Sequence, residues 1–247
     1  MRSLHFLLCY IALFSISVSQ ETEIKTGSYI INSTTTEIAG QNIATTNQAI
    51  IPHDEKLTWE ITVPDNYSSE NPPGILIYIS PENEINIPRG WLDITKEKNL
   101  IWIAARNSGN DIYTMKRILL AMTGIQYVQD RYKLDLNRIY ITGFSGGGRV
   151  ASIMASQNPN IFKGAIYNCG VNFWNNVSDN NLDMIKENRY VFITGSEDFN
   201  LNDTRQVYSK YKKAGVSSVD LMVIPRMGHS NPRSSRLKRA IEFLDGS

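Results

Sequence analysis

RIYITGFSGGG, residues 138–148, is the most informative stretch of this 247-residue sequence. The β-branched and aromatic residues at its start predict a strand, which runs directly into Gly143-x-Ser145-x-Gly147, and a helix-compatible stretch follows at 149–157. In that context the two glycines let strand and helix approach closely around a strained backbone, so the serine hydroxyl is exposed at the sheet edge. No Lys-Ser/Thr pair follows, which excludes a phosphate-binding loop. We predict that Ser145 is a catalytic nucleophile.

Short apolar runs alternate with amphipathic stretches on either side of this segment. The expected strands are 57–63, 75–79, 100–105, 139–144, 164–169, 190–194 and 219–224, and the expected helices are 112–131, 147–157, 203–214 and 234–244. This pattern predicts the α/β class, with a mostly parallel, doubly wound sheet and helices on both faces, in one domain over 57–247. Residues 20–56 are rich in Thr, Asn and Ser and predict an extended leader with an edge strand near 29–31.

A serine nucleophile needs an imidazole base, and the imidazole needs a carboxylate. His229 lies in a loop between the last expected strand and the last expected helix, whereas His53 precedes the sheet and reads as a surface residue. Asp198 follows the strand at 190–194 and is our predicted acid, with the adjacent Glu197 as its competitor. All three groups follow parallel strands, so they are expected at one edge of the sheet.

These pieces resemble the α/β-hydrolase superfamily, and within it the secreted esterases grouped with polyhydroxybutyrate depolymerases and feruloyl esterases. The resemblance rests on the Gly-Phe-Ser-Gly-Gly-Gly segment, on Gly195 to Asn200 and on the Met227-Gly228-His229 loop. It implies a single α/β-hydrolase domain that cleaves a small-molecule or polymer ester through an acyl-enzyme. It also implies that the reaction needs neither a metal nor another cofactor.

The oxyanion hole is where the sequence departs from this pattern. One donor is expected to be the backbone amide of Gly146, which follows the nucleophile. Many relatives carry His-Gly after the strand at 75–79, but this chain has Ser80-Pro81-Glu82, and proline has no amide hydrogen. Glu82 is therefore the predicted second donor, with Ser80 as the alternative.

Two tryptophans are candidates for the walls of a substrate-binding site. Trp174 follows the strand at 164–169, so its loop is expected to border the same edge of the sheet as Ser145. Trp91 lies between the strands at 75–79 and 100–105. Packing is the alternative role for either ring.

Residues 1–19 resemble a secretory signal, with Arg2 before an apolar run and small residues up to Ser19. Cleavage there predicts a secreted or periplasmic protein with no stable membrane insertion. The chain has 25 basic and 24 acidic side chains, so losing Arg2 leaves equal numbers, and we expect no nucleic-acid partner. Cys169 then remains as the only cysteine.

Two other functions stay open at this point. The order Ser145, Asp198, His229 also suits a serine peptidase of the prolyl-oligopeptidase type, although 247 residues leave no room for an upstream propeller domain. A non-catalytic binding protein on a hydrolase scaffold is the third possibility, and the complete set of three catalytic groups argues against it.

Overall fold

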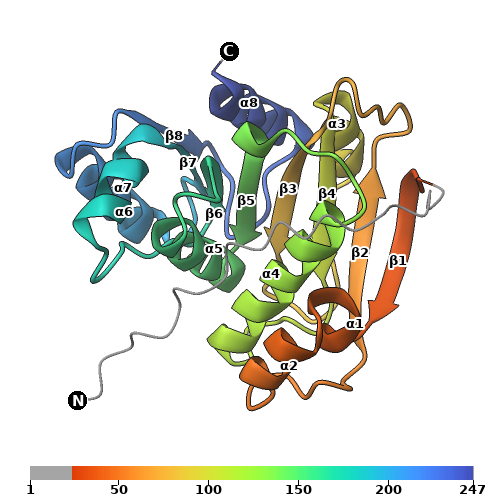
Figure 1. Cartoon of the computed structure of the whole chain (residues 1–247). Coiled ribbons are helices and arrows are strands. Elements are labelled where there is room, and N and C mark those ends of the chain that lie inside the picture. The colour runs from red at the N-terminus through yellow and green to blue at the C-terminus, as the bar shows by residue number, and fades with distance from the viewer. Residues whose placement is uncertain (1–23, 247) are drawn as a thin grey trace.

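A computed structural model describes residues 24–246, so the predicted signal segment lies outside the described residues. Eight strands form one sheet in the order β1-β2-β4-β3-β5-β6-β7-β8 (Figure 1). Their bounds are β1 Gly27–Ser33, β2 Leu57–Val63, β3 Gly74–Ile79, β4 Leu100–Ala105, β5 Ile139–Phe144, β6 Gly164–Asn168, β7 Arg189–Gly195 and β8 Ser218–Ile224. The β1–β2 and β2–β4 pairs are antiparallel and all the others are parallel. The predicted doubly wound, mostly parallel sheet is confirmed.

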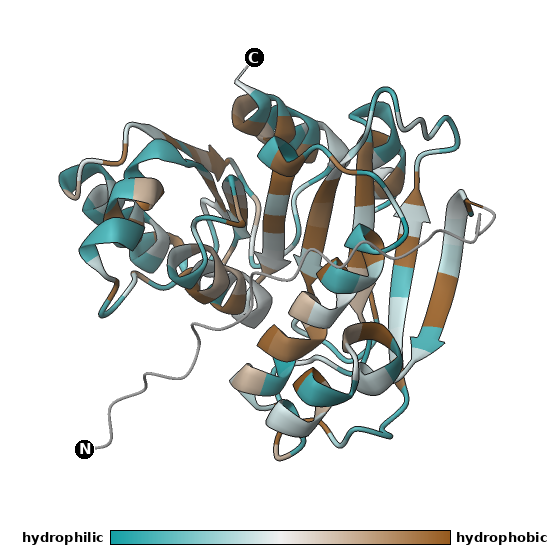
Figure 2. Cartoon of the chain, in the orientation of Figure 1, coloured by the Kyte–Doolittle hydropathy of each residue, from teal (hydrophilic) through white to brown (hydrophobic). Residues whose placement is uncertain are grey.

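Helices cover both faces of this sheet. Their bounds are α1 Thr35–Ala39, α2 Gln41–Asn47, α3 Trp91–Glu97, α4 Thr114–Gln129, α5 Gly146–Gln157, α6 Asp179–Glu187, α7 Leu201–Lys213 and α8 Ser234–Asp245, with a 3₁₀ turn at Leu136–Arg138. Figure 1 shows α4 and α5 in front of the strands. Figure 2 shows the central strands to be largely hydrophobic, as expected for strands that are buried on both faces.

The two faces of β3 show how the sequence builds two cores. Ile75 and Ile77 pack into the larger apolar cluster, which includes residues of α4, α5 and α7. Leu76 and Tyr78 point to the opposite face and pack with Trp91 of α3 and with α8. Because side chains alternate along a strand, one continuous apolar run supplies both layers.

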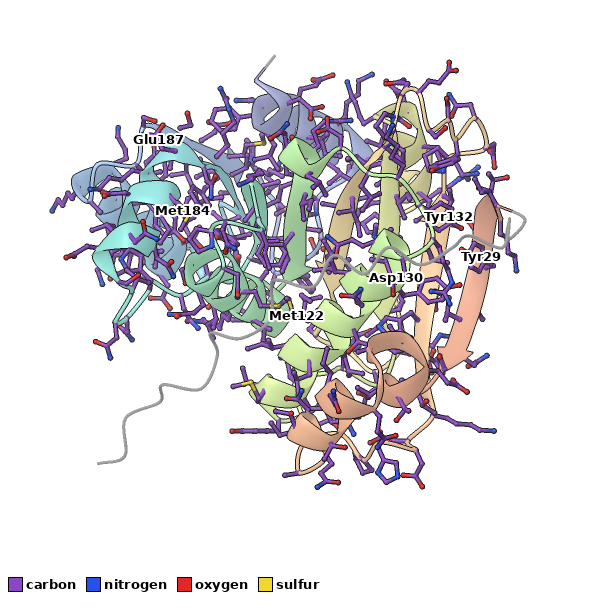
Figure 3. All side chains as sticks on the ribbon, viewed as in Figure 1. Tyr29, Met122, Asp130, Tyr132, Met184 and Glu187 are labelled. Carbon is purple, nitrogen blue, oxygen red and sulfur yellow. The ribbon has the colours of Figure 1, made fainter. Side chains whose placement is uncertain are left out.

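The segment expected as an extended leader is partly helical. It supplies the edge strand β1, as expected, but α1 and α2 follow it, and α1 packs against α4. The capping box formed by Thr34 and Glu37 starts α1 and is the local signal that the composition obscured. Tyr29 of β1 also hydrogen-bonds Tyr132, hydroxyl to hydroxyl, at 2.6 Å (Figure 3). β1 therefore belongs to the same sheet as β2 to β8, and α1 packs against α4 of the same domain.

Besides α1 and α2, two further helices that the sequence did not predict, α3 and α6, flank the sheet. α3 begins at Trp91, and α6 lies in the segment between β6 and β7, where no helix was expected. α6 packs beside α5 and buries Ile185 (its Met184 and Glu187 are labelled in Figure 3). Among residues 24–246, no helix has the length and apolar character to cross a membrane.

Candidate active site

Ser145 lies at a sharp turn between β5 and α5, with φ 54° and ψ −121°. Tight packing of glycines makes this turn possible. A Cβ on Gly143 would fall 2.4 Å from the carbonyl oxygen of Gly147, and one on Gly147 would fall 2.0 Å from the carbonyl oxygen of Ile79. Gly146 is the first residue of α5, so its amide has no acceptor within the helix. That amide and the positive end of the helix dipole both lie next to the serine.

The structure brings Ser145, His229 and Asp198 together in one hydrogen-bonded chain. His229 Nε2 lies 2.9 Å from Ser145 Oγ, and His229 Nδ1 lies 2.8 Å from Asp198 Oδ1. An ionised carboxylate only accepts hydrogen bonds, so Nδ1 carries the proton and donates to Asp198. Nε2 is then left as the acceptor of the serine proton. This geometry gives the three groups the arrangement of a nucleophile, a general base and an orienting acid.

The Asp198 carboxylate is fully enclosed and held from several sides. Thr194 Oγ1 donates to Oδ2 at 2.8 Å, and the Asn200 amide donates to Oδ1 at 3.0 Å. Burial raises the pKa of this carboxyl. The hydrogen bonds it accepts, first from the Asn200 amide and then from the Cys169 thiol, His229 and Thr194, outweigh burial and leave its pKa below the ordinary value. Asp198 is therefore ionised at neutral pH.

Two phenylalanines contact the His229 ring. Phe199 stacks on it with the ring centroids 4.1 Å apart, and Phe144 contacts it at 4.9 Å. Phe199 is 76% exposed, so it is an aromatic surface at the open side of the site. The sequence places Phe199 beside Asp198, but exposure depends on tertiary packing and could not be predicted.

Trp91 does not line the site, which corrects the prediction that it is a substrate wall. Its side chain is fully buried, packs edge-to-face on Tyr78, and donates from Nε1 to the carbonyl of Pro232 at 3.0 Å. The first residue of α3 is thus held beneath the loop that carries His229. Its role in this structure is packing and support of that loop.

The predicted second oxyanion donor, Glu82, is also not supported. The Glu82 amide donates to Ser80 Oγ at 3.0 Å in a local turn, so it is already engaged, and the residue is exposed. Serine hydroxyls commonly make such turns with the amide two residues on. Pro81 has no N–H to donate. Ser80, the alternative, is buried, and its hydroxyl donates to the Glu84 carbonyl at 3.2 Å; a role for its backbone amide stays a prediction.

Three further residues were considered for the site from the sequence: Trp174 as a substrate wall, Glu197 as the acid and His53 as the base. Trp174 is half-buried and stacks on Phe173 with the centroids 4.1 Å apart, and it also packs edge-to-face on Tyr211. Its substrate role stays a prediction. Glu197, the competitor for the acid, is exposed, as is His53.

Cys169 lies beside the acid as a buried free thiol. Burial, followed by the neighbouring Asp198, raises its pKa to about 12, so the thiol stays protonated. Metal-ligating atoms of Cys169, Asp198 and His229 lie within 4.8 Å of one another. Both ring nitrogens of His229 take part in the hydrogen-bonded chain, so a metal bound at His229 would break one of its two hydrogen bonds.

Sequence reasoning assigned no role to Asn110, which contacts Gly146, or to Arg117, which donates a hydrogen bond to Asn110. Asn110, in the loop after β4, reaches over Gly146, and Arg117 of α4 is 4% exposed. A signal for Arg117 existed, because it falls on the helical stripe that continues through Ala121, Gly124 and Val128. A cation on such a stripe indicates a buried charge.

Residues 121–190 match the model of the prolyl oligopeptidase family, a segment that contains Ser145 but neither Asp198 nor His229. A ferulic acid esterase structure superposes with a TM-score of 0.63 at 13% identity, covering 90% of this chain and 99% of that one. This chain has an α/β-hydrolase fold. S-formylglutathione hydrolase of Staphylococcus aureus aligns with a TM-score of 0.57 at 14% identity, over 89% of this chain and 96% of that one.

A peptidase structure is similar over a smaller share of its own length. It is a protein provisionally named dipeptidyl aminopeptidase IV, from Bacteroides ovatus ATCC 8483, with a TM-score of 0.61 and 15% identity. The match covers 87% of this chain, which spans 35% of the length of that protein. No curated protein matches the sequence.

Proposed function

We propose that this protein is a serine hydrolase that cleaves carboxylic esters through an acyl-enzyme. The observation that carries the proposal is the continuous hydrogen-bonded chain from Ser145 Oγ through His229 to the ionised Asp198, next to the free helix-terminal amide of Gly146. Those are the groups that acyl transfer needs. The signal-like residues 1–19 support secretion of the enzyme.

The proposed reaction has two halves. Ser145 Oγ attacks the ester carbonyl carbon as its proton passes to His229 Nε2, and the carbonyl oxygen becomes an oxyanion that accepts from the Gly146 amide. Collapse of this intermediate breaks the ester C–O bond, and His229 gives its proton to the leaving alcohol. Water then repeats the attack on the acyl-serine, which releases the acid and restores Ser145.

Two observations support an ester rather than a peptide substrate. The similar structures include a ferulic acid esterase and an S-formylglutathione hydrolase. The exposed Phe199 ring also presents apolar surface directly against His229, where an acyl or alcohol group would lie. The second candidate is a peptidase, which the prolyl oligopeptidase match over residues 121–190 favours.

Hydrolysis of matched leaving groups distinguishes the two candidates. We expect p-nitrophenyl esters of increasing acyl length to be turned over, and p-nitroanilides of amino acids and dipeptides to be turned over at least about 10²-fold more slowly in kcat/KM. The measurement is release of the chromophore at neutral pH by the protein starting at Gln20. Anilide turnover equal to or faster than ester turnover would replace the esterase proposal with the peptidase.

Phe199→Ala tests the apolar surface beside His229. Removing the ring is expected to raise KM for a long-chain p-nitrophenyl ester by about 10-fold while leaving the acetate ester within about threefold, because only the longer acyl group reaches Phe199. Leu136→Ala is the control, since Leu136 is also an exposed apolar side chain but precedes β5, at the other end of that strand from Ser145. Equal effects on both esters would show that the ring acts through His229 and does not contact substrate.

A further inference from the structure

We propose that the side-chain amide of Asn110 is the second oxyanion donor, and that the buried Arg117 is the positioning residue that orients it. This inference rests on the proposed function and adds to it a residue that sequence reasoning did not identify. In this enzyme a side chain from the loop after β4 takes the place expected for a backbone amide after β3.

Asn110 lies directly against the residue that follows the nucleophile. A Cβ built on Gly146 would fall 2.0 Å from Asn110 Oδ1 and 3.0 Å from Nδ2, so only glycine fits beneath this amide. The Asn110 side chain is exposed, and therefore accessible from the open side of the site. The Asn110 amide therefore packs against the residue whose backbone N–H is the first expected oxyanion donor.

The loop that carries Asn110 is tied to the loop after β3. The Asn110 backbone amide donates to the carbonyl of Pro81 at 2.9 Å. Next to it, the Gly109 amide donates to Asn83 Oδ1 at 2.9 Å, and the Asn107 amide donates to the Asn83 carbonyl at 2.8 Å. These bonds hold the backbone of the Asn110 loop in place without using its side-chain NH₂ group.

Arg117 fixes the orientation of the Asn110 side-chain amide. Its Nη2 donates to the Ser80 carbonyl at 2.7 Å and its Nη1 donates to Asn110 Oδ1 at 3.3 Å. Because a guanidinium only donates, the oxygen of the Asn110 amide must face Arg117, and the two N–H donors of Nδ2 are left for another acceptor. The positive charge also polarises the amide and strengthens those donors.

The electrostatic setting favours an anion here. Arg117 is 4% exposed and forms no ion pair with a carboxylate within residues 24–246, and its Nε has no hydrogen-bond partner in that range. Asp111 stabilises the cation at longer range, against the effect of burial, which lowers its pKa. A buried guanidinium stays charged, so a cation without a direct carboxylate partner lies behind the Asn110 amide and favours negative charge on the far side of that amide.

Two positions of the loop after β3, Pro81 and Glu82, offer no free N–H for this role. Pro81 has no N–H, and the Glu82 amide already donates to Ser80 Oγ. Two donors are the usual minimum for an acyl-transfer intermediate, and Gly146 supplies one. Asn110 is thus the described side chain that meets the geometric requirement for the other.

Asn110→Asp is the most informative variant, because it keeps the shape of the side chain. The new carboxylate would form an ion pair with Arg117 and so preserve the loop, but it removes the donors and places negative charge beside the oxyanion. We expect kcat on a p-nitrophenyl ester to fall at least about 10²- to 10³-fold with KM changed by less than about threefold. Asn110→Ala should lose a similar factor, and Arg117→Gln a smaller one, because the amide loses its orientation while the donors remain.

A trifluoromethyl ketone provides a readout that a structural role would not change. Ser145 adds to its carbonyl and generates a stable oxyanion, so its affinity should fall in the Asn110 variants in parallel with kcat, at an unchanged melting temperature. Asn86→Ala, an exposed asparagine in the loop after β3, is the matched control. Full activity in Asn110→Asp, or kcat loss without loss of ketone affinity, would overturn the inference.

The inference and the proposed function fail in different ways. Wild-type turnover that depends on Ser145, together with Asn110 variants within about threefold of it, removes Asn110 alone from the mechanism. A folded wild type that neither turns over esters nor binds the ketone ends the proposed function, and the role of Asn110 with it.

Discussion

Replacing Ser145 with alanine is expected to abolish ester hydrolysis, with kcat falling by a factor on the order of 10⁶. The substitution removes one oxygen from a side chain that donates to His229 and nothing from the core. Ala and Ser pay a similar cost for the positive φ of 54°, so the turn between β5 and α5 should survive. The measurement is p-nitrophenyl ester turnover, with circular dichroism to verify the fold.

Covalent labelling provides an independent test of the same residue. A fluorophosphonate should react at Ser145 Oγ with loss of fluoride, and peptide mass spectrometry should find the phosphonyl group there and not in the alanine variant. Ser209→Ala is the control, because Ser209 is an exposed serine on α7. Label at another serine, or undiminished turnover in Ser145→Ala, would contradict the nucleophile assignment.

Asp198→Asn is expected to lower kcat by about 10⁴-fold while leaving KM nearly unchanged. Asp198 Oδ1 accepts from His229 Nδ1, and Thr194 donates to Oδ2. In the variant, the amide oxygen still accepts from His229 Nδ1 and from the Asn200 amide, and the NH₂ group donates to the Thr194 hydroxyl. The negative charge is lost, so the imidazolium that forms when His229 takes the serine proton is no longer stabilised. Steady-state kinetics on the ester panel measures the effect.

The same variant should change how stability depends on pH. The pKa of Asp198 is lower in the folded protein than its ordinary value, so the ionised carboxylate stabilises the fold above about pH 4. That stabilisation is lost as the pH falls through the folded-state pKa. Urea unfolding between neutral pH and pH 3 should therefore show a shallower loss of stability for Asp198→Asn than for the wild type. Asp203→Asn, an exposed acid on α7, is the control, and equal pH dependence of all three proteins would contradict the expectation.

Several features of this protein follow from contiguous residues. The strand, turn and helix around Ser145 are encoded within one segment, and each parallel strand was predicted to within one residue of its observed bounds. The reason is that a strand buried on both faces needs an uninterrupted apolar run, and the turn needs glycine where no Cβ fits. The order of strands then brings Ser145, Asp198 and His229 to one edge, because parallel strands end on the same side.

Helices with weak local signals were harder to predict. α1, α2, α3 and α6 are each at most nine residues long, too short to show a clear apolar period. They are stabilised mainly by packing against distant segments, such as α1 on α4 and α6 on α5.

The sequence by itself determined the sheet, the nucleophile turn and the three groups that share its edge, because these depend on local pattern and on chain direction. Only the tertiary structure decided where Trp91, Glu82 and Asn110 lie and what they contact. Trp91 is buried by contact with Pro232, 141 positions away, and the Glu82 amide is taken by Ser80. Asn110 meets Gly146 because Arg117 and the β3 loop hold it there. Burial, free donors and amide orientation are properties of three-dimensional neighbours, which no stretch of sequence specifies alone.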